Sequence, residues 1–145
     1  MTIRPEQPMK ILLVEDDIGH ATLVQMNLRE GGLNNAIEHA TDGQQALDYV
    51  NQYVKSNDTT ALLVLLDLNL PGVDGYEVLK ALKANDKTRQ IPVIVLTSTD
   101  DDKEIEQCYA LGCNAYLQKP VDYGDFINSI RTLGLFLSVI NIPRK

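Results

Sequence analysis

Five short apolar segments recur along this chain, and the intervals between them carry helical patterns. The most apolar segment is ALLVLL at residues 61–66, as expected of a parallel strand that is covered on both faces. The other four segments are KILLV, AIEHA, PVIVL and NAYL, at residues 10–14, 36–40, 92–96 and 114–117. They recur about every 25 residues with a helix between each pair, so the sequence predicts a parallel sheet with helices on both faces.

The composition excludes several classes of protein. Apolar residues make up 44% of the chain, which is enough for a buried core, and 20 acidic residues against 13 basic ones give a net charge of -7. This charge repels phosphate backbones, so we expect no direct binding of nucleic acid. The chain contains no signal-peptide pattern and no apolar run long enough to cross a membrane. We therefore expect a cytoplasmic protein without membrane association.

Polar residues follow four of the five predicted strands, where ligands of open α/β sheets bind. These residues are Glu15, Asp16, Asp17, Asp67, Thr97, Ser98 and Lys119. Carboxylates, hydroxyls and an ammonium on one rim predict a cation site with room for a phosphoryl group. Each residue also has a purely structural interpretation: a carboxylate after a strand often caps the next helix, as we expect of Asp17, and Asp67 precedes a Pro-Gly turn. Their joint occurrence favours a site.

Phosphatases and mutases of the haloacid dehalogenase type also use an Asp after a parallel strand. They need a second Asp two residues after the nucleophile, as acid and base. Asn69 stands at that position after Asp67, and its amide cannot transfer a proton. The sequence therefore argues against turnover of a small phosphorylated substrate.

Four motifs resemble those of the response-regulator receiver domain, the phosphoacceptor of two-component signalling. They are ILLVEDD at 11–17, LLDLNLPGVDGYEVL at 65–79, IPVIVLTS at 91–98 and AYLQKP at 115–120. The resemblance implies a flavodoxin-like (βα)5 sandwich with strand order 2-1-3-4-5 and an extended C-terminal helix. The polar loop before the third strand and the tail LGLFLSVINIPRK further resemble stand-alone regulators paired with cyanobacterial phytochromes.

The resemblance also implies roles for individual residues. Asp67 would accept the phosphoryl group, and Thr97 and Lys119 would bind its oxygens. The cation would be Mg²⁺, with Mn²⁺ or another divalent ion as alternatives. Its protein ligands would be Glu15, Asp16, Asp67 and the main-chain carbonyl of Asn69. Thr97 and Tyr116 would form the conformational switch, and the Lys119–Pro120 bond would be cis.

The function implied is that of a single-domain response regulator, phosphorylated by a histidine kinase of the phytochrome type. It would signal by conformational change and protein–protein interaction, and it would not be an enzyme beyond its own phosphorylation and dephosphorylation. The alternative is a pseudo-receiver, an interaction domain that acts without phosphorylation. We expect a disordered segment at 1–8, a receiver domain at 9–132 and a helical extension at 133–145.

The tail has more apolar residues than one helix can bury on a sheet. Between positions 133 and 140, six of eight residues are apolar, whereas a helix packed on one face buries a single stripe. The residues off that stripe predict a homodimer contact. The residues off the stripe are Leu135, Phe136 and Val139, and we expect Ile140 to join them in the contact. The alternative is a tail that folds back over its own domain.

Two residue types have no assigned role. His20 and His39 lack partners at metal-binding or phosphorelay spacing. We interpret His20 as a solvated residue on the polar face of the first helix, and the alternative is that it lies beside the acidic pocket. Cys108 and Cys113 suit neither a zinc site nor a disulfide framework, so we interpret them as small buried hydrophobic residues.

Overall fold

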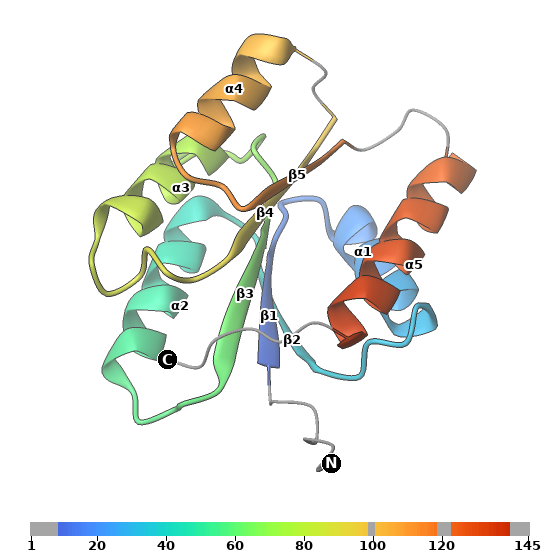
Figure 1. The fold of residues 1–145 in the computed structure, drawn as a ribbon, viewed down its shortest axis with the longest axis horizontal. Coiled ribbons are helices and arrows are strands. Elements are labelled where there is room, and N and C mark those ends of the chain that lie inside the picture. The colour runs from blue at the N-terminus through green and yellow to red at the C-terminus, as the bar shows by residue number, and fades with distance from the viewer. Residues whose placement is uncertain (1–8, 99–100, 119–122, 140–145) are drawn as a thin grey trace, which may run out of the picture.

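The computed structural model describes residues 9–98, 101–118 and 123–139, and Figure 1 shows a central sheet between two layers of helices. The strands are β1 (Met9–Val14), β2 (Ala36–Ala40), β3 (Ala61–Leu66), β4 (Val93–Thr97) and β5 (Ala115–Gln118). The helices are α1 (Ile18–Glu30), α2 (Gly43–Lys55), α3 (Gly75–Ala84), α4 (Asp102–Ala110) and α5 (Tyr123–Val139). The strands pair in parallel in the order β2-β1-β3-β4-β5. This confirms the predicted fold class and strand order, with strand ends shifted by at most one residue.

Alternate residues of the central strands point to opposite faces of the sheet and build two apolar cores. On one face, residues such as Val64 and Leu66 pack with α2, α3 and α4. On the other face, Leu63 and Leu65 pack with α1 and α5, which lie side by side in Figure 1. Every residue of β3 is buried, as expected of a strand that is covered on both sides.

Aspartates fix the start of four helices near the carboxyl ends of the strands. The side chains of Asp17, Asp42, Asp74 and Asp101 each accept a hydrogen bond from a backbone N–H in the first turn of α1, α2, α3 and α4. The predicted cap at Asp17 is therefore confirmed. These caps anchor the loops that surround the rim of the sheet.

Both cysteines lie in the core on the α2, α3 and α4 side. Cys108 is fully buried in α4 and Cys113 is buried in the loop before β5. This confirms their interpretation as small buried hydrophobic residues.

Candidate functional site

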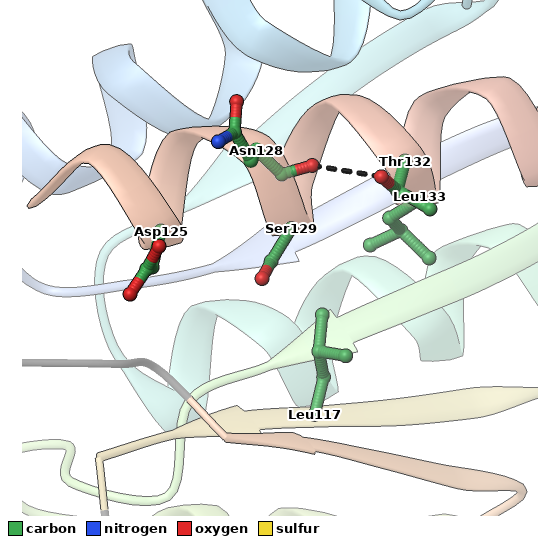
Figure 2. Close-up of a pocket in the computed structure, with 6 residues that line it drawn as sticks. All are labelled: Leu117, Asp125, Asn128, Ser129, Thr132 and Leu133. Atoms are coloured by element: carbon green, nitrogen blue, oxygen red, sulfur yellow. Dashed lines mark hydrogen bonds between the residues drawn. The ribbon is translucent and has the colours of Figure 1, made fainter. Parts of the chain in front are cut away.

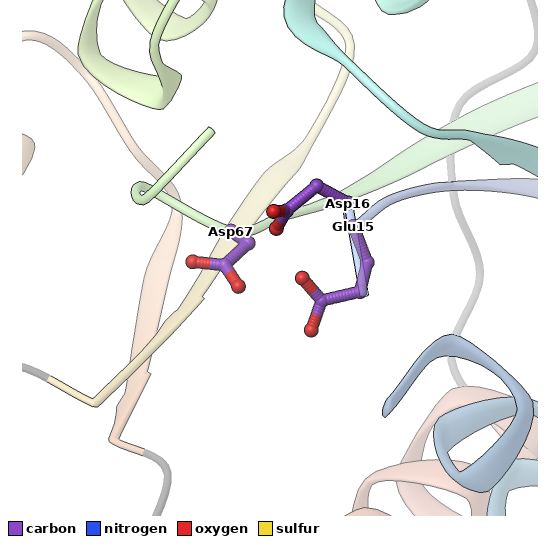
Figure 3. A group of neighbouring side chains, drawn as sticks. All are labelled: Glu15, Asp16 and Asp67. Atoms are coloured by element: carbon purple, nitrogen blue, oxygen red, sulfur yellow. The ribbon is translucent and has the colours of Figure 1, made fainter. Parts of the chain in front are cut away.

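Three carboxylates lie together beyond the ends of β1 and β3. The Glu15 N–H donates to the Ala40 carbonyl, and the Asp67 N–H donates to the Val14 carbonyl, both at 3.0 Å. The sheet ladder thus continues one residue beyond each strand and brings Glu15 close to Asp67. One carboxylate oxygen from each of Glu15, Asp16 and Asp67 lies within 4.8 Å of the others. Figure 3 shows the three carboxylates turned toward a common space.

The members of this acidic cluster differ in exposure. Glu15 is 3% exposed and Asp67 is 8% exposed, whereas Asp16 is open to solvent. Three negative charges at this separation repel one another, and their oxygens are the ligands that hard divalent cations prefer. The acidic cluster therefore has the charge and the donor atoms of a divalent-cation site that is accessible from the side of Asp16.

The backbone after β3 folds closely behind Asp67. The Asn69 N–H donates to Asp67 Oδ1 at 3.0 Å, and the Gly75 N–H donates to the Leu68 carbonyl at 3.0 Å. A Cβ atom on Gly75 would lie 2.4 Å from the Asp67 carbonyl oxygen and 2.4 Å from Leu68 Cα. Only glycine allows α3 to begin this close to β3, so Gly75 helps to fix the position of Asp67.

Thr97 and Tyr116 lie on adjacent strands, β4 and β5. Thr97 is fully buried at the last position of β4, opposite Gln118. Tyr116 is half-buried and packs against the core on the α4 side, as Tyr76 does. Burial raises the pKa of the Tyr76 phenol to about 12, and the nearby carboxylate of Glu104 adds to the effect. The two residues of the predicted switch therefore border the same face of the sheet.

Several predicted residues lie outside the part of the chain that the structure describes. Lys119 and Pro120 belong to the gap after β5, and Ile140 lies beyond α5. The side chains of Leu135, Phe136 and Val139 are also outside the described residues. The predicted phosphoryl contact of Lys119, the cis bond and the dimer contact stay predictions.

Both histidines of the chain contact Glu15; the sequence suggested a place beside the acidic pocket only as the alternative for His20, and it gave no such indication for His39. His39 Nε2 lies 2.7 Å from the Glu15 carbonyl oxygen, and His20 Nδ1 lies 3.6 Å from Glu15 Oε1. The side chain of His20 is 56% exposed, so it is solvated as interpreted, but it also borders the acidic cluster. The sequence contained a signal for the His20 contact, because the side chain of the third residue of a capped helix can reach back over the preceding loop.

A hollow lies between β5 and α5, and none of its described lining residues belongs to the acidic cluster. Its volume is about 590 Å³, and its lining residues, drawn in Figure 2, are Leu117, Asp125, Asn128, Ser129, Thr132 and Leu133. The Thr132 hydroxyl donates within α5 to the Asn128 carbonyl at 2.9 Å. Among the described residues that line this hollow, Asp125 is the single carboxylate, and these residues alone do not form the donor set of a cation site. Among the described residues, none of the helices has the length and apolar character needed to cross a membrane.

Comparison with known proteins gives a consistent result. Residues 11–131 match the family model of the response regulator receiver domain. A solved receiver domain of a response regulator from Rhodospirillum rubrum is 48% identical, with 94% of this chain and 98% of that chain covered and a TM-score of 0.88. The response regulator Rcp1 of Synechocystis is 33% identical over 145 residues, which is 99% of each chain.

Two solved structures of response regulators are also similar to this chain. One is the Mn²⁺-bound form of Rcp1, and the other is the phosphorylated cyanobacterial phytochrome response regulator RcpA. Each is 32% identical with a TM-score of 0.83, covering 94% of this chain and 99% of the matched chain.

Proposed function

Because the chain belongs to the response regulator receiver domain family, we propose that it is a single-domain response regulator whose Asp67 accepts a phosphoryl group from a histidine kinase. The observation that carries this proposal is the convergence of Glu15, Asp16 and Asp67, with carboxylate oxygens within 4.8 Å of one another. Asn69 offers no acid or base two residues after Asp67, which disfavours turnover of a separate substrate. The protein is therefore a phosphoacceptor rather than an enzyme in the usual sense.

The cation proposed for the acidic cluster is Mg²⁺. Asp16 would be its main carboxylate ligand, Glu15 a ligand directly or through water, and Asp67 and the Asn69 carbonyl would complete the protein ligands. An oxygen donor set with one open side suits a hard ion that keeps several waters. Mn²⁺ is the alternative, since the related Rcp1 has a Mn²⁺-bound form. When bound, the cation supplies positive charge that offsets the carboxylates and the phosphoryl oxygens.

Asp67 is the proposed nucleophile. In the transfer step an O–P bond forms between an Asp67 carboxylate oxygen and phosphorus, while the N–P bond of the kinase phosphohistidine breaks. The hydrogen bond from the Asn69 N–H to Oδ1 orients the carboxylate for this step. The hydroxyl of Thr97 and the ammonium of Lys119 would then bind the phosphoryl oxygens.

The signal is proposed to be a rearrangement of β4 and β5. Phosphorylation of Asp67 replaces a single carboxylate charge with a phosphoryl group that carries nearly two negative charges, beside the buried end of β4. A shift of Thr97 toward the phosphoryl group would change the space next to Tyr116, which is half-buried on the adjacent strand. The surface around α4 and β5 would change with it, and a partner protein would read that surface.

Intact mass after incubation with acetyl phosphate and Mg²⁺ tests the phosphoacceptor. The wild-type protein should gain one phosphoryl group, the Asp67→Asn variant none, and the control Asp86→Asn, which changes an exposed aspartate, should gain one. Without divalent cations Asp67→Asn should also unfold at a higher temperature, because it relieves repulsion within the acidic cluster. No gain by the wild-type protein would favour the pseudo-receiver, and a gain by Asp67→Asn would place the acceptor elsewhere.

We further propose that the kinase partner is a phytochrome, because the related RcpA is a phytochrome response regulator. The protein would act in the cytoplasm, where such a kinase presents its phosphohistidine. Phosphotransfer from a panel of purified histidine kinases tests this assignment. A phytochrome-type kinase should transfer fastest, and faster transfer from an unrelated kinase would contradict the proposal.

The receiver unit is proposed to span residues 9–132, with residues 133–145 forming a homodimer contact. Leu133, the first residue of this segment, is buried in α5 against the α1 side of the sheet, and a helix packed on one face buries only a single apolar stripe, which supports a second contact for the other apolar residues of the segment. Sedimentation at micromolar concentration should show a dimer that Phe136→Asp dissociates. The control Thr132→Asp, an exposed position one turn earlier, should stay dimeric. A monomeric wild-type protein would refute the contact.

A further inference from the structure

The backbone of Glu15 is bound to β2 through both of its polar groups. Its N–H donates to the Ala40 carbonyl at 3.0 Å, which continues the parallel ladder. Its carbonyl pairs with a side chain instead, because His39 Nε2 lies 2.7 Å from the carbonyl oxygen. A carbonyl oxygen can only accept a hydrogen bond, so Nε2 carries a proton and donates. His39 is therefore a hydrogen-bond donor to the main chain of the acidic cluster.

The end of β2 explains why a side chain takes this place. In a longer parallel ladder, the Glu15 carbonyl would accept from the next backbone donor of the neighbouring strand. β2 ends at Ala40, however, and the chain turns into α2, where the Thr41 N–H donates to Gln45 Oε1 at 2.9 Å. The ring of His39, the residue before the end of the strand, thus supplies a donor at the point where the strand stops.

This hydrogen bond fixes the direction in which the chain leaves β1. The peptide group between Glu15 and Asp16 is planar, so an anchored carbonyl also sets the positions of the Asp16 nitrogen and Cα. Asp16 is the exposed member of the acidic cluster, so core packing does not hold its side chain in place. The next residue, Asp17, is held by α1, whose first turn it caps. The segment is therefore anchored at one end by His39 and at the other end by the helix.

We propose that His39 is a positioning residue of the phosphoacceptor site: its ring N–H orients the peptide between Glu15 and Asp16 and so places the Asp16 carboxylate in the acidic cluster. This inference rests on the proposed function. In this role His39 touches neither the cation nor the phosphoryl group, and it acts through the backbone that carries Asp16. Loss of a hydrogen bond that orients a metal ligand typically lowers metal affinity about 10- to 100-fold.

Two amide variants of His39 test the proposal. The side-chain nitrogen of glutamine reaches about as far from Cα as Nε2 of histidine, whereas that of asparagine is one bond closer. His39→Gln therefore keeps a donor within reach of the Glu15 carbonyl, and His39→Asn does not. In His39→Asn, the Mg²⁺ concentration for half-maximal phosphorylation by acetyl phosphate should rise about tenfold or more, and in His39→Gln less than about threefold. The rate at saturating Mg²⁺ should change little, because Asp67 is held separately by its N–H bond to Val14.

Two measurements on the full chain need no phosphoryl donor. Calorimetric titration should show the same loss of Mg²⁺ affinity in His39→Asn as the kinetics do. In the metal-free wild-type protein, long-range ¹H–¹⁵N NMR spectra should show the neutral ring of His39 with its proton on Nε2. The control is Glu38→Gln, because Glu38 is the exposed neighbour of His39 in β2, and this variant should behave like the wild type.

The outcomes separate this inference from the proposed function. An unchanged Mg²⁺ dependence in His39→Asn would overturn the inference, and so would equal losses in His39→Asn and His39→Gln, or a neutral ring with its proton on Nδ1. If His39→Asn does not fold, His39→Leu takes its place as the variant without a donor. If the wild-type protein binds Mg²⁺ but gains no phosphoryl group, the proposed function fails, and the calorimetric comparison alone decides the role of His39.

Discussion

The close approach of α3 to β3 leads to a quantitative prediction for Gly75→Ala. The added Cβ would lie 2.4 Å from the Asp67 carbonyl oxygen and from Leu68 Cα. Each contact is about 1 Å shorter than the ~3.5 Å at which carbon and its neighbours pack. Both neighbours are backbone atoms, so no side-chain rotation can relieve the clash. The start of α3 and the segment that carries Asp67 must therefore move apart.

The expected loss of stability follows from two opposing effects. Overpacking of this kind lowers the free energy of unfolding by up to about 3 kcal/mol, and replacing glycine by alanine in a helix raises it by up to about 1 kcal/mol. The net loss in the free energy of unfolding is thus about 2 kcal/mol, which for a chain of this size lowers the melting temperature by about 4–8 °C. Urea and thermal unfolding followed by circular dichroism measure both quantities.

Gly19→Ala is a matched control, because Gly19 also lies in the first turn of a helix. Its added Cβ would approach only one atom, the capping oxygen Asp17 Oδ1, at 3.2 Å, and a shift of a few tenths of an ångström in this side-chain atom relieves the contact. The control should change stability by less than about 1 kcal/mol. The Gly75→Ala variant should also bind Mg²⁺ more weakly, because the displaced segment carries Asp67. A Gly75→Ala protein as stable as the control would refute the steric argument.

Two further predictions concern charged residues. Asp16→Ala should weaken Mg²⁺ binding in calorimetry much more than Glu15→Ala, because Asp16 is the shorter and more rigid ligand, and equal losses would contradict this ranking. The second prediction concerns stability in acid. A hydrogen bond from Lys10 at 2.6 Å, together with hydrogen bonds from Thr60, holds the pKa of the Asp58 carboxyl well below its usual range. With the folded-state pKa below the unfolded value of about 4, the ionised carboxylate stabilises the fold above that pH and loses this contribution as the pH falls further. Asp58→Asn should therefore lower the urea midpoint at neutral pH by an amount that shrinks below pH ~4, and a pH-independent loss would contradict the assignment.

The fold could be predicted because its signals are local. The apolar segment 61–66 is buried on both faces, and no amphipathic pattern competes with this interpretation. The edge strand β2 gave a weaker signal, since four of its five residues, Ala36 to His39, are exposed or only half-buried. The gathering of Glu15, Asp16 and Asp67 also followed from the sequence, because the carboxyl ends of parallel strands share one edge of the sheet.

Contacts between distant side chains could not be predicted in the same way. His39 reaches the Glu15 carbonyl because β1 and β2 pair with Val14 opposite Ala40, and a register shift of one residue would turn the ring to the other face. Lys10 meets Asp58 across 48 residues, and that contact depends on the path of the loop before β3. Such contacts require the register and the loop conformations, which hydrophobic periodicity does not encode.

The strand register that builds the core also brings the repelling carboxylates of the site together. Val14 and Leu66 are paired neighbours on β1 and β3, and both are fully buried. Glu15 and Asp67 come one residue later, so the packing that places two apolar side chains together also places two carboxylates together. The carboxylates cannot separate without opening the core beneath them. Folding therefore holds the two carboxylates close together despite their mutual repulsion. The proposed cation would bind at a site that needs little reorganisation. It follows that cation affinity depends on core packing at Val14 and Leu66 as well as on the ligands themselves.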